Sequence, residues 1–394
     1  MTKRGQDFCV EYPEDFDQPH REYERLRREC PVAHTDSLGG FWVLTRYDDV
    51  KRAASDSDVF ITSRQNVVPK IAYTGRRPPL HLDPPEHTPY RKTLNPLLAK
   101  ERAEGFAERT RELSRELLAP MVANGGGDIC TEFSSYLPVQ VFGEWMRMPA
   151  DWLPVLHERG RAFVLAVHTN DPGAMKETSL SLYEIAHAMI DLRKKEPQDP
   201  ALDPTSALLA ARHKGERLPD DLVVGTVRQV LLVGIVAPMV MIGSICVHLC
   251  RDPGLQDRLR RQPDLMSKAI EEFLRLYTPY RGFARTAVQD VEMSGTTIPK
   301  GDAIALLYCS ANRDESVFPE ADKFILDRPN IHEHLAFGRG PHNCPGVHFG
   351  RMELRVAMQE LLAATPAGFE LDGDITMTRW PEIGALSVPL RFLK

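Results

Sequence analysis

The sequence predicts a mainly α-helical protein with small β-sheets at its periphery. Apolar residues recur every three or four positions, as in an amphipathic helix, in residues 19–30, 100–123, 179–196, 253–277 and 349–364. Runs that resemble strands are short, and they fall at residues 39–47, 291–309 and 387–394. No repeat or linker divides the chain, so we expect residues 1–394 to form one domain.

The most apolar part of the chain is residues 231–247, seventeen positions without a charge, which is the lower edge of a membrane-spanning length. Residues 196–221, rich in Pro and Asp, read as a loop around a short helix that leads into it. Pro238 lies in the middle of the apolar run, and its flanks lack the Lys/Arg asymmetry of a membrane span. We therefore expect a long helix buried in the middle of the domain, and no membrane partner.

Composition narrows the class of function. A formal net charge of -6 without a long basic stripe speaks against nucleic-acid binding, so we expect a small-molecule partner. The charged N-terminal segment lacks the apolar core of a secretory signal, which predicts a cytoplasmic protein. The seven cysteines are odd in number and scattered, as expected for free thiols in a reducing compartment: Cys9, Cys30, Cys130, Cys246, Cys250, Cys309 and Cys344.

A loop rich in Gly and Pro, residues 334–351, carries a single cysteine, Cys344, just before a predicted helix. One interpretation is a zinc site built from that thiol and its neighbouring histidines, His332, His334, His342 and His348. Structural zinc sites usually supply paired thiols, which this loop lacks. The other interpretation is a lone thiolate that binds a large planar cofactor, for which glycine permits close approach of the backbone.

The loop resembles the haem-binding signature F-x-x-G-x-[HR]-x-C-x-G of the cytochrome P-450 superfamily. The matching residues are Phe337, Gly340, His342, Cys344 and Gly346. Other segments resemble the family in the same order: Glu272 and Arg275 as its E-x-x-R pair, Arg328 in the meander, His87 and Arg91 before the loop, and Arg285 after the E-x-x-R helix.

The resemblance implies the triangular P-450 fold, with one haem b bound by Cys344 as its axial metal ligand. It implies further haem contacts from His87, Arg91, Arg285, Phe337, Gly338, His342 and Gly346. It also implies a structural ionic triad of Glu272, Arg275 and Arg328. A buried triad of this kind costs about 3–5 kcal/mol when one partner is removed, so we expect its loss to prevent haem incorporation.

The central helix departs from the family pattern, which carries an acid–alcohol pair for proton delivery. Gly234 keeps a small residue, but Ala237 and Pro238 occupy the positions of the acid and the alcohol. Proline in a helix crowds the carbonyl four residues back, so we expect a kink at Gly234. Three explanations stay open: protons delivered by water or by a polar group of the substrate, peroxide in place of dioxygen, or another residue in a different register.

The implied reaction is insertion of one oxygen atom from dioxygen into a small organic substrate. We expect a monomer, with electrons from a ferredoxin and its reductase, and Arg339 and Arg351 as docking candidates. The alternatives are a peroxide-using protein and a haem-thiolate carrier without turnover. The resemblance places residues 64–77, 163–168, 280–283 and 383–386 near the pocket. Arg64, Arg76, Arg77 and Arg281 are candidates to meet a carboxylate, although we expect each to be exposed.

Overall fold

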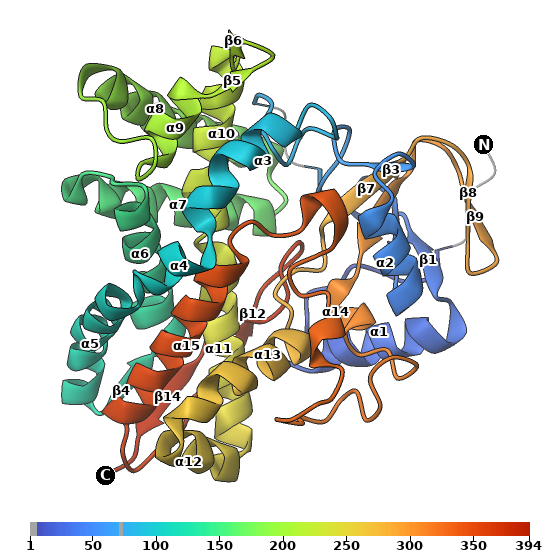
Figure 1. The fold of residues 1–394 in the computed structure, drawn as a ribbon. Coiled ribbons are helices and arrows are strands. Elements are labelled where there is room, and N and C mark those ends of the chain that lie inside the picture. The colour runs from blue at the N-terminus through green and yellow to red at the C-terminus, as the bar shows by residue number, and fades with distance from the viewer. Residues whose placement is uncertain (1–5, 71–73) are drawn as a thin grey trace.

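The computed structural model describes residues 6–70 and 74–394. Most of the described chain is helical, as the sequence predicts. Figure 1 shows the long helices gathered around α11 and α15, with the largest sheet and helices α1 and α2 on the other side. The helices are α1 (Gln18–Glu29), α2 (Tyr47–Ser55), α3 (Thr88–Leu94), α4 (Lys100–Glu104), α5 (Ala107–Asn124), α6 (Leu137–Trp145), α7 (Leu153–His168), α8 (Pro172–Lys195), α9 (Pro204–Ala210), α10 (Asp220–Val233), α11 (Val236–Arg251), α12 (Pro253–Arg261), α13 (Met266–Leu276), α14 (Tyr308–Ala311) and α15 (Val347–Ala364).

Local sequence fixes the ends of these helices. The side chain of Asp171 accepts a hydrogen bond from the Ala174 N–H at 3.0 Å at the start of α8, and Pro172 occupies its first turn. Asp252 caps α12 in the same way through the Leu255 N–H, at 2.9 Å. Short helical turns join several elements: η1 (Ser37–Gly39), η2 (Asn95–Leu98), the π-helical η3 (Ile129–Ser134), η4 (Ala150–Trp152), η5 (Pro263–Leu265), η6 (Ile331–Glu333) and η7 (Gly340–His342).

The largest sheet has five strands in the order β1-β2-β10-β7-β3. β2 pairs antiparallel with β1 and parallel with β10, so a strand from the last third of the chain lies beside one from its start. The other sheets have two or three strands. The strands are β1 (Val32–Thr35), β2 (Phe41–Leu44), β3 (Phe60–Ile61), β4 (Gly126–Asp128), β5 (Arg212–His213), β6 (Glu216–Arg217), β7 (Ala284–Ala287), β8 (Val291–Met293), β9 (Thr296–Ile298), β10 (Ala303–Leu306), β11 (Phe369–Leu371), β12 (Thr376–Met377), β13 (Ala385–Ser387) and β14 (Pro389–Phe392).

Two segments expected as continuous helices are each divided in two. Residues 100–123 are interrupted between α4 and α5 at Gly105, and residues 253–277 are interrupted between α12 and α13 by η5, which begins at Pro263. Both breaks fall at residues that weaken a helix, because glycine is conformationally free and proline lacks an N–H. The predicted loop over residues 196–221 does contain a short helix, α9, and also the hairpin β5–β6, which the sequence did not indicate.

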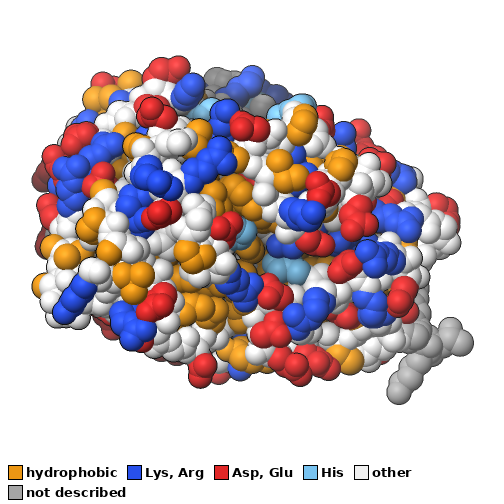
Figure 2. Space-filling model, turned by 90° about the horizontal axis from the view of Figure 1, so that it is seen from below, with side chains coloured by type: hydrophobic (Ala, Val, Ile, Leu, Met, Phe, Trp, Pro, Cys, Tyr) orange, Lys and Arg blue, Asp and Glu red, His pale blue; other side chains and the backbone are white. Residues whose placement is uncertain are grey.

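The apolar segment lies in the core. One helical stretch, Asp220–Arg251, is long and apolar enough to cross a membrane, but 78% of its most apolar window is buried within the fold. Burial of this kind is typical of the central helix of a large domain. The face in Figure 2 mixes acidic and basic side chains, without a continuous basic stripe over it. All seven cysteines are free thiols, as expected.

Candidate functional site

The cysteine loop is shaped by two glycines in the left-handed region, Gly338 with φ 68° and Gly340 with φ 72°. A Cβ atom at Gly340 would lie 2.6 Å from the carbonyl oxygen of Ala54, so a larger side chain would collide with the backbone of α2. The N–H of Cys344 donates to the carbonyl of Phe337 at 2.8 Å, which closes the loop. These constraints hold Cys344 just before the first residue of α15.

Cys344 is partly exposed, and its environment acts on the thiol in two directions. Desolvation raises the pKa of Cys344, while the backbone N–H of Gly346 and the positive charges of Arg91 and Arg351 lower it in part. Arg351 is itself paired with Glu271 at 2.6 Å and lies over the ring of Phe337. Arg351, one of the two candidates for docking an electron donor, therefore already forms contacts within the fold. Arg339, the other candidate, is exposed.

The histidines of the loop do not gather around the thiol. His334 pairs with Glu271 at 3.0 Å, and His332 lies 3.5 Å from Glu333. Among residues 6–70 and 74–394, the group of acids, histidines or thiols close enough together to hold a metal ion is Glu24, Glu315 and Asp322, at the surface and apart from the loop. The geometry therefore gives no support to the zinc interpretation.

Basic side chains converge on the loop from separate parts of the chain. Arg91 of α3 donates to the carbonyl of Asn343 at 2.6 Å, and its second amino group donates to the amide oxygen of Asn343 at 3.0 Å. Arg285 of β7 is buried and donates to the Ala284 carbonyl at 3.0 Å. Within the described chain, neither Arg91 nor Arg285 forms an ion pair with a carboxylate. Two cations beside the loop are thus available to an anionic group of a ligand.

Two histidines complete this basic group. The ring of His87 lies 4.9 Å from that of His342, centroid to centroid, and its Nε2 is 3.2 Å from the carbonyl oxygen of Pro341. Nε2 of His342 lies 3.3 Å from the hydroxyl of Thr62 and 4.0 Å from Asp83. Burial and the charge of Arg285 lower the pKa of His342 to about 3, so its ring is neutral at pH 7. The structure brings together all four basic residues that the sequence predicted.

Glu272, Arg275 and Arg328 meet as the sequence predicted. Arg275 binds the carboxylate of Glu272 through two bonds of 2.7 and 2.9 Å, and Nε of Arg328 binds the same carboxylate at 3.0 Å. Glu272 and Arg275 are 0% exposed, and Arg328 is 4% exposed. The remaining guanidinium donors bind carbonyls of residues 312–323, so the triad fixes the segment that leads to the cysteine loop.

The central helix is broken where the sequence predicted a kink. α10 ends at Val233 and α11 begins at Val236, and the N–H of Ile235 donates to the carbonyl of Leu232, three residues back, at 3.1 Å. Gly234 is required here, because a Cβ would lie 2.4 Å from the ring of Phe142 in α6. Pro238 is buried, whereas Gly234 and Ala237 are partly exposed.

The break presents apolar surface at a point where both flanking helices are buried. The side chain of Val233 is 45% exposed, although the residues on either side of the break are mostly buried. Ser134 of η3 donates to the carbonyl of Met239 at 3.1 Å and so supports the distorted helix. The sequence did not indicate this hydrogen bond. α11 packs along α15, the helix that follows the cysteine loop (Figure 1). The broken helix and the thiol loop therefore belong to adjoining parts of the core.

Comparison with known proteins agrees with this geometry. The family model described as Cytochrome P450 matches residues 167–365. The mycinamicin IV hydroxylase/epoxidase of Micromonospora griseorubida is 33% identical over 381 residues, which cover 93% of each chain. The chain belongs to the cytochrome P450 family. The linalool 8-monooxygenase of Pseudomonas putida is 31% identical over 90% of each chain, and the solved structure of CYP101J2 matches with a TM-score of 0.87 at 25% identity over 100% of both chains.

Cytochromes P450 contain a haem iron, and the residues of this site fit such a group. The loop offers one thiol with glycines that permit close approach of a flat ring. Arg91 and Arg285 offer charges that no carboxylate of the described chain neutralises, as the acidic side chains of a haem would require. The protein is therefore an oxidoreductase of the P450 monooxygenase family. Its bacterial relatives act on small organic substrates.

Two of the four arginines expected at the surface are buried, so that prediction was wrong for them. Arg64 and Arg76 are exposed, but Arg77 is 4% exposed and Arg281 is 3% exposed. Arg281 donates to the hydroxyl of Tyr23 at 3.1 Å and lies over the ring of Trp380. Sequence reasoning also missed Arg228 of α10, which is 0% exposed. The sequence signal that could have indicated this residue is its charge within an otherwise apolar helix.

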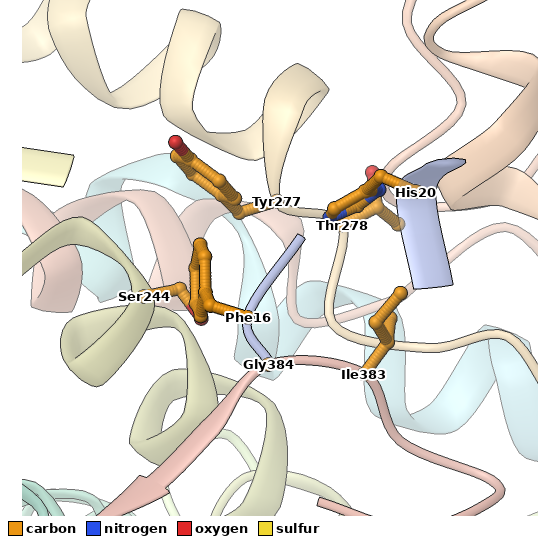
Figure 3. Close-up of a pocket in the computed structure, with 7 residues that line it drawn as sticks. All are labelled: Phe16, His20, Ser244, Tyr277, Thr278, Ile383 and Gly384. Carbon is orange, nitrogen blue, oxygen red and sulfur yellow. The ribbon is translucent and has the colours of Figure 1, made fainter. Parts of the chain in front are cut away.

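A narrow crevice lies between α1, α11 and α13 (Figure 3). Phe16, Tyr277 and Ile383 line it together with His20, Ser244, Thr278 and Gly384, and it is too narrow to hold a water molecule. Burial is the main reason that the pKa of His20 is lowered, so its ring stays neutral. The crevice adjoins the predicted pocket segment 383–386, but it contains neither a thiol nor a charged side chain.

Proposed function

We propose that this P450 is a haem b monooxygenase in which Cys344 is the axial ligand of the iron. The observation that carries the proposal is the closed loop of Cys344, which holds one thiol beside cationic side chains without carboxylate partners. In this role Arg91, Arg285, His87 and His342 hold the two propionates of the haem. Phe337, Gly338 and Gly346 shape the loop beside the ring.

The haem, when bound, supplies the activation of dioxygen and the transfer of one oxygen atom to the substrate. The protein supplies binding, orientation and control of protons. Gly234, Ala237 and Pro238 line the oxygen and substrate side of the central helix. The triad of Glu272, Arg275 and Arg328 holds the segment before the loop rigid, which fixes the position of the Cys344 sulfur.

Proton delivery differs from the usual acid–alcohol arrangement, because neither Ala237 nor Pro238 has a side chain that exchanges a proton. Pro238 also leaves the carbonyl oxygen of Gly234 without the usual helical donor, so that oxygen is able to bind a water. We propose that such a water, or a polar group of the substrate, moves protons at the break. Electrons come from a ferredoxin and its reductase, and the protein acts in the cytoplasm as a single-domain monomer.

The test is replacement of Cys344 by serine. The Cys344→Ser variant is expected to lose the carbon monoxide difference band of a thiolate-bound haem, because the hydroxyl is a far weaker donor. Cys9→Ser is the matched control, since Cys9 is exposed and distant in sequence. A Cys344→Ser protein with unchanged haem content and an unchanged band would refute the proposal.

A second candidate function follows from Ala237 and Pro238 alone. Without an acid–alcohol pair, the protein would use peroxide, or would bind ligands at the haem without turnover. Assays of product formation distinguish peroxide use and ligand binding without turnover from monooxygenation with dioxygen. Product with the reduced ferredoxin chain and dioxygen supports monooxygenation, product with peroxide alone supports the second reaction, and spectral shifts without product in either assay indicate a carrier.

A further inference from the structure

Two arginines are buried side by side, away from the cysteine loop. Arg228 belongs to α10 and is 0% exposed, and Arg77, on the segment that enters α3, is 4% exposed. Gly225 brings them together, because it lies one turn before Arg228 and has no side chain. A Cβ atom at Gly225 would lie 1.9 Å from the carbonyl oxygen of Arg76 and 3.4 Å from Cα of Arg77. The backbone of residues 76–77 therefore rests directly on α10.

Neutral groups hold the two guanidinium groups in place. Arg228 donates to the hydroxyl of Ser179 in α8 at 3.1 Å, and its guanidinium carbon lies 4.7 Å from the ring centre of Phe163 in α7. Nη2 of Arg77 lies 3.1 Å from Nε2 of His81. Burial and the charges of the two arginines lower the pKa of His81 to about 3, so its ring is neutral and accepts that bond.

Several donors of this pair have no hydrogen-bond partner among residues 6–70 and 74–394. They are Nε and Nη1 of Arg228 and Nε of Arg77, and all three are buried. Within the described chain, neither arginine forms an ion pair. Residues 71–73, outside the described part, are Ile, Ala and Tyr and add no carboxylate. Burial and the charge of Arg77 hold the pKa of Arg228 well below its usual range. Two buried like charges without a counterion are costly, and an anion would stabilise both.

We propose that Arg77 and Arg228 bind the carboxylate of the substrate, and that this P450 oxidises apolar organic acids. The inference rests on the proposed function, because it names the substrate class of that same site. Arg228 lies six residues before Gly234, a distance of about 9 Å along the helix at 1.5 Å per residue. Phe163 and Leu232 lie on or against this stretch and offer an apolar wall. The acid therefore places its apolar end at the helix break.

The probe is 4-propylbenzoate, compared with its uncharged methyl ester in the haem-loaded protein. Affinity is measured by the change in haem spin state and, independently, by calorimetry. We expect the acid to bind about ten- to a hundredfold more tightly than the ester, the range expected for hydrogen bonds to a charged group. Arg228→Met and Arg77→Met abolish this preference. Arg76→Met, the exposed neighbour, retains it.

A second measurement separates binding from structural damage. Because an unpaired buried charge is removed, Arg228→Met should melt at a higher temperature than wild type without ligand, while it loses the extra thermal stabilisation that the acid gives. Equal affinity of wild type for acid and ester would overturn the inference, as would an anion site that chloride fills without any preference for the acid. In either case an intact carbon monoxide band and turnover of the ester leave the proposed function standing. Loss of that band from wild type would instead refute the proposed function.

Discussion

Pro238 lies four residues after Gly234 and has no N–H with which to bond the Gly234 carbonyl, and the central helix breaks at residues 234–235, within the turn before Pro238. The break is stabilised by contacts from outside the helix. Phe142 lies where a side chain at residue 234 would have to fit, and Ser134 bonds the carbonyl of Met239. The proposed loss of the acid–alcohol pair would therefore fall beside a distortion of the helix that contacts from other elements support.

The first prediction concerns proton delivery at this break. The double variant Ala237→Asp with Pro238→Thr restores a side-chain acid and alcohol, and a positioned donor contributes about a hundred- to ten-thousandfold in rate. We expect it to raise the share of NADH consumption that ends in product, most of all for substrates without a polar group near the site of oxidation. The amounts of product formed and of NADH consumed are both measured in the same ferredoxin-driven assay. Near-complete coupling of the wild-type protein with such apolar substrates would contradict substrate assistance.

The second prediction concerns the buried triad. Arg275→Met removes two buried hydrogen bonds to Glu272 and leaves the carbonyls of residues 312 and 321 without their donor, so we expect a loss of about 3–5 kcal/mol in the free energy of unfolding and little haem incorporation. Denaturant unfolding and the ratio of haem to protein measure the two effects. Lys268→Ala is the control, because it removes an exposed pair with Asp327. That variant should unfold like wild type, and equal stability of both variants would show that the triad contributes little.

Features with a fixed spacing in sequence were predictable, and features that depend on packing between distant segments were not. The cysteine loop and the Glu272–Arg275 pair are local, and Pro238 acts on its own helix, so the residues themselves indicated each. Arg228 is a charged residue in a largely apolar helix, but its complete burial depends on contacts with α7 and α8 that its own segment does not reveal. Arg77 sits in a polar, Pro-rich loop whose contact with Gly225 of α10 no local pattern reveals.

The third prediction tests the close approach at the cysteine loop. Gly340→Ala must both adopt a φ of 72° and place its Cβ against the Ala54 carbonyl, so we expect clear destabilisation and reduced haem content. Gly215→Ala separates the two causes, since Gly215 has a φ of 88° but nothing within 4 Å of an added Cβ. Thermal unfolding should show a smaller loss for Gly215→Ala. Equal losses would mean that backbone conformation, and not the contact with α2, is what requires glycine.

The fourth prediction concerns Glu353, a residue of α15 that is 3% exposed, with one carboxyl oxygen that has no hydrogen-bond partner in the described part of the chain. Desolvation raises the pKa of Glu353 to about 8 from its usual 4.5. The neutral carboxyl is therefore favoured in the folded protein. Its stabilising contribution is fully present below pH 4.5 and is lost as the pH rises towards 8.

Glu353→Gln should remove this dependence, so its stability relative to wild type should rise between pH 5 and pH 8.5 by on the order of 1–3 kcal/mol. Denaturant midpoints at the two pH values measure it. Glu360→Gln, on the same helix, is the matched control, because Glu360 binds Arg111 and Arg115 at 3.0 and 2.8 Å. That variant should be destabilised at both pH values, since two arginines lose their partner. A Glu353→Gln variant whose stability falls with pH as steeply as wild type would show that the carboxyl stays ionised in the fold.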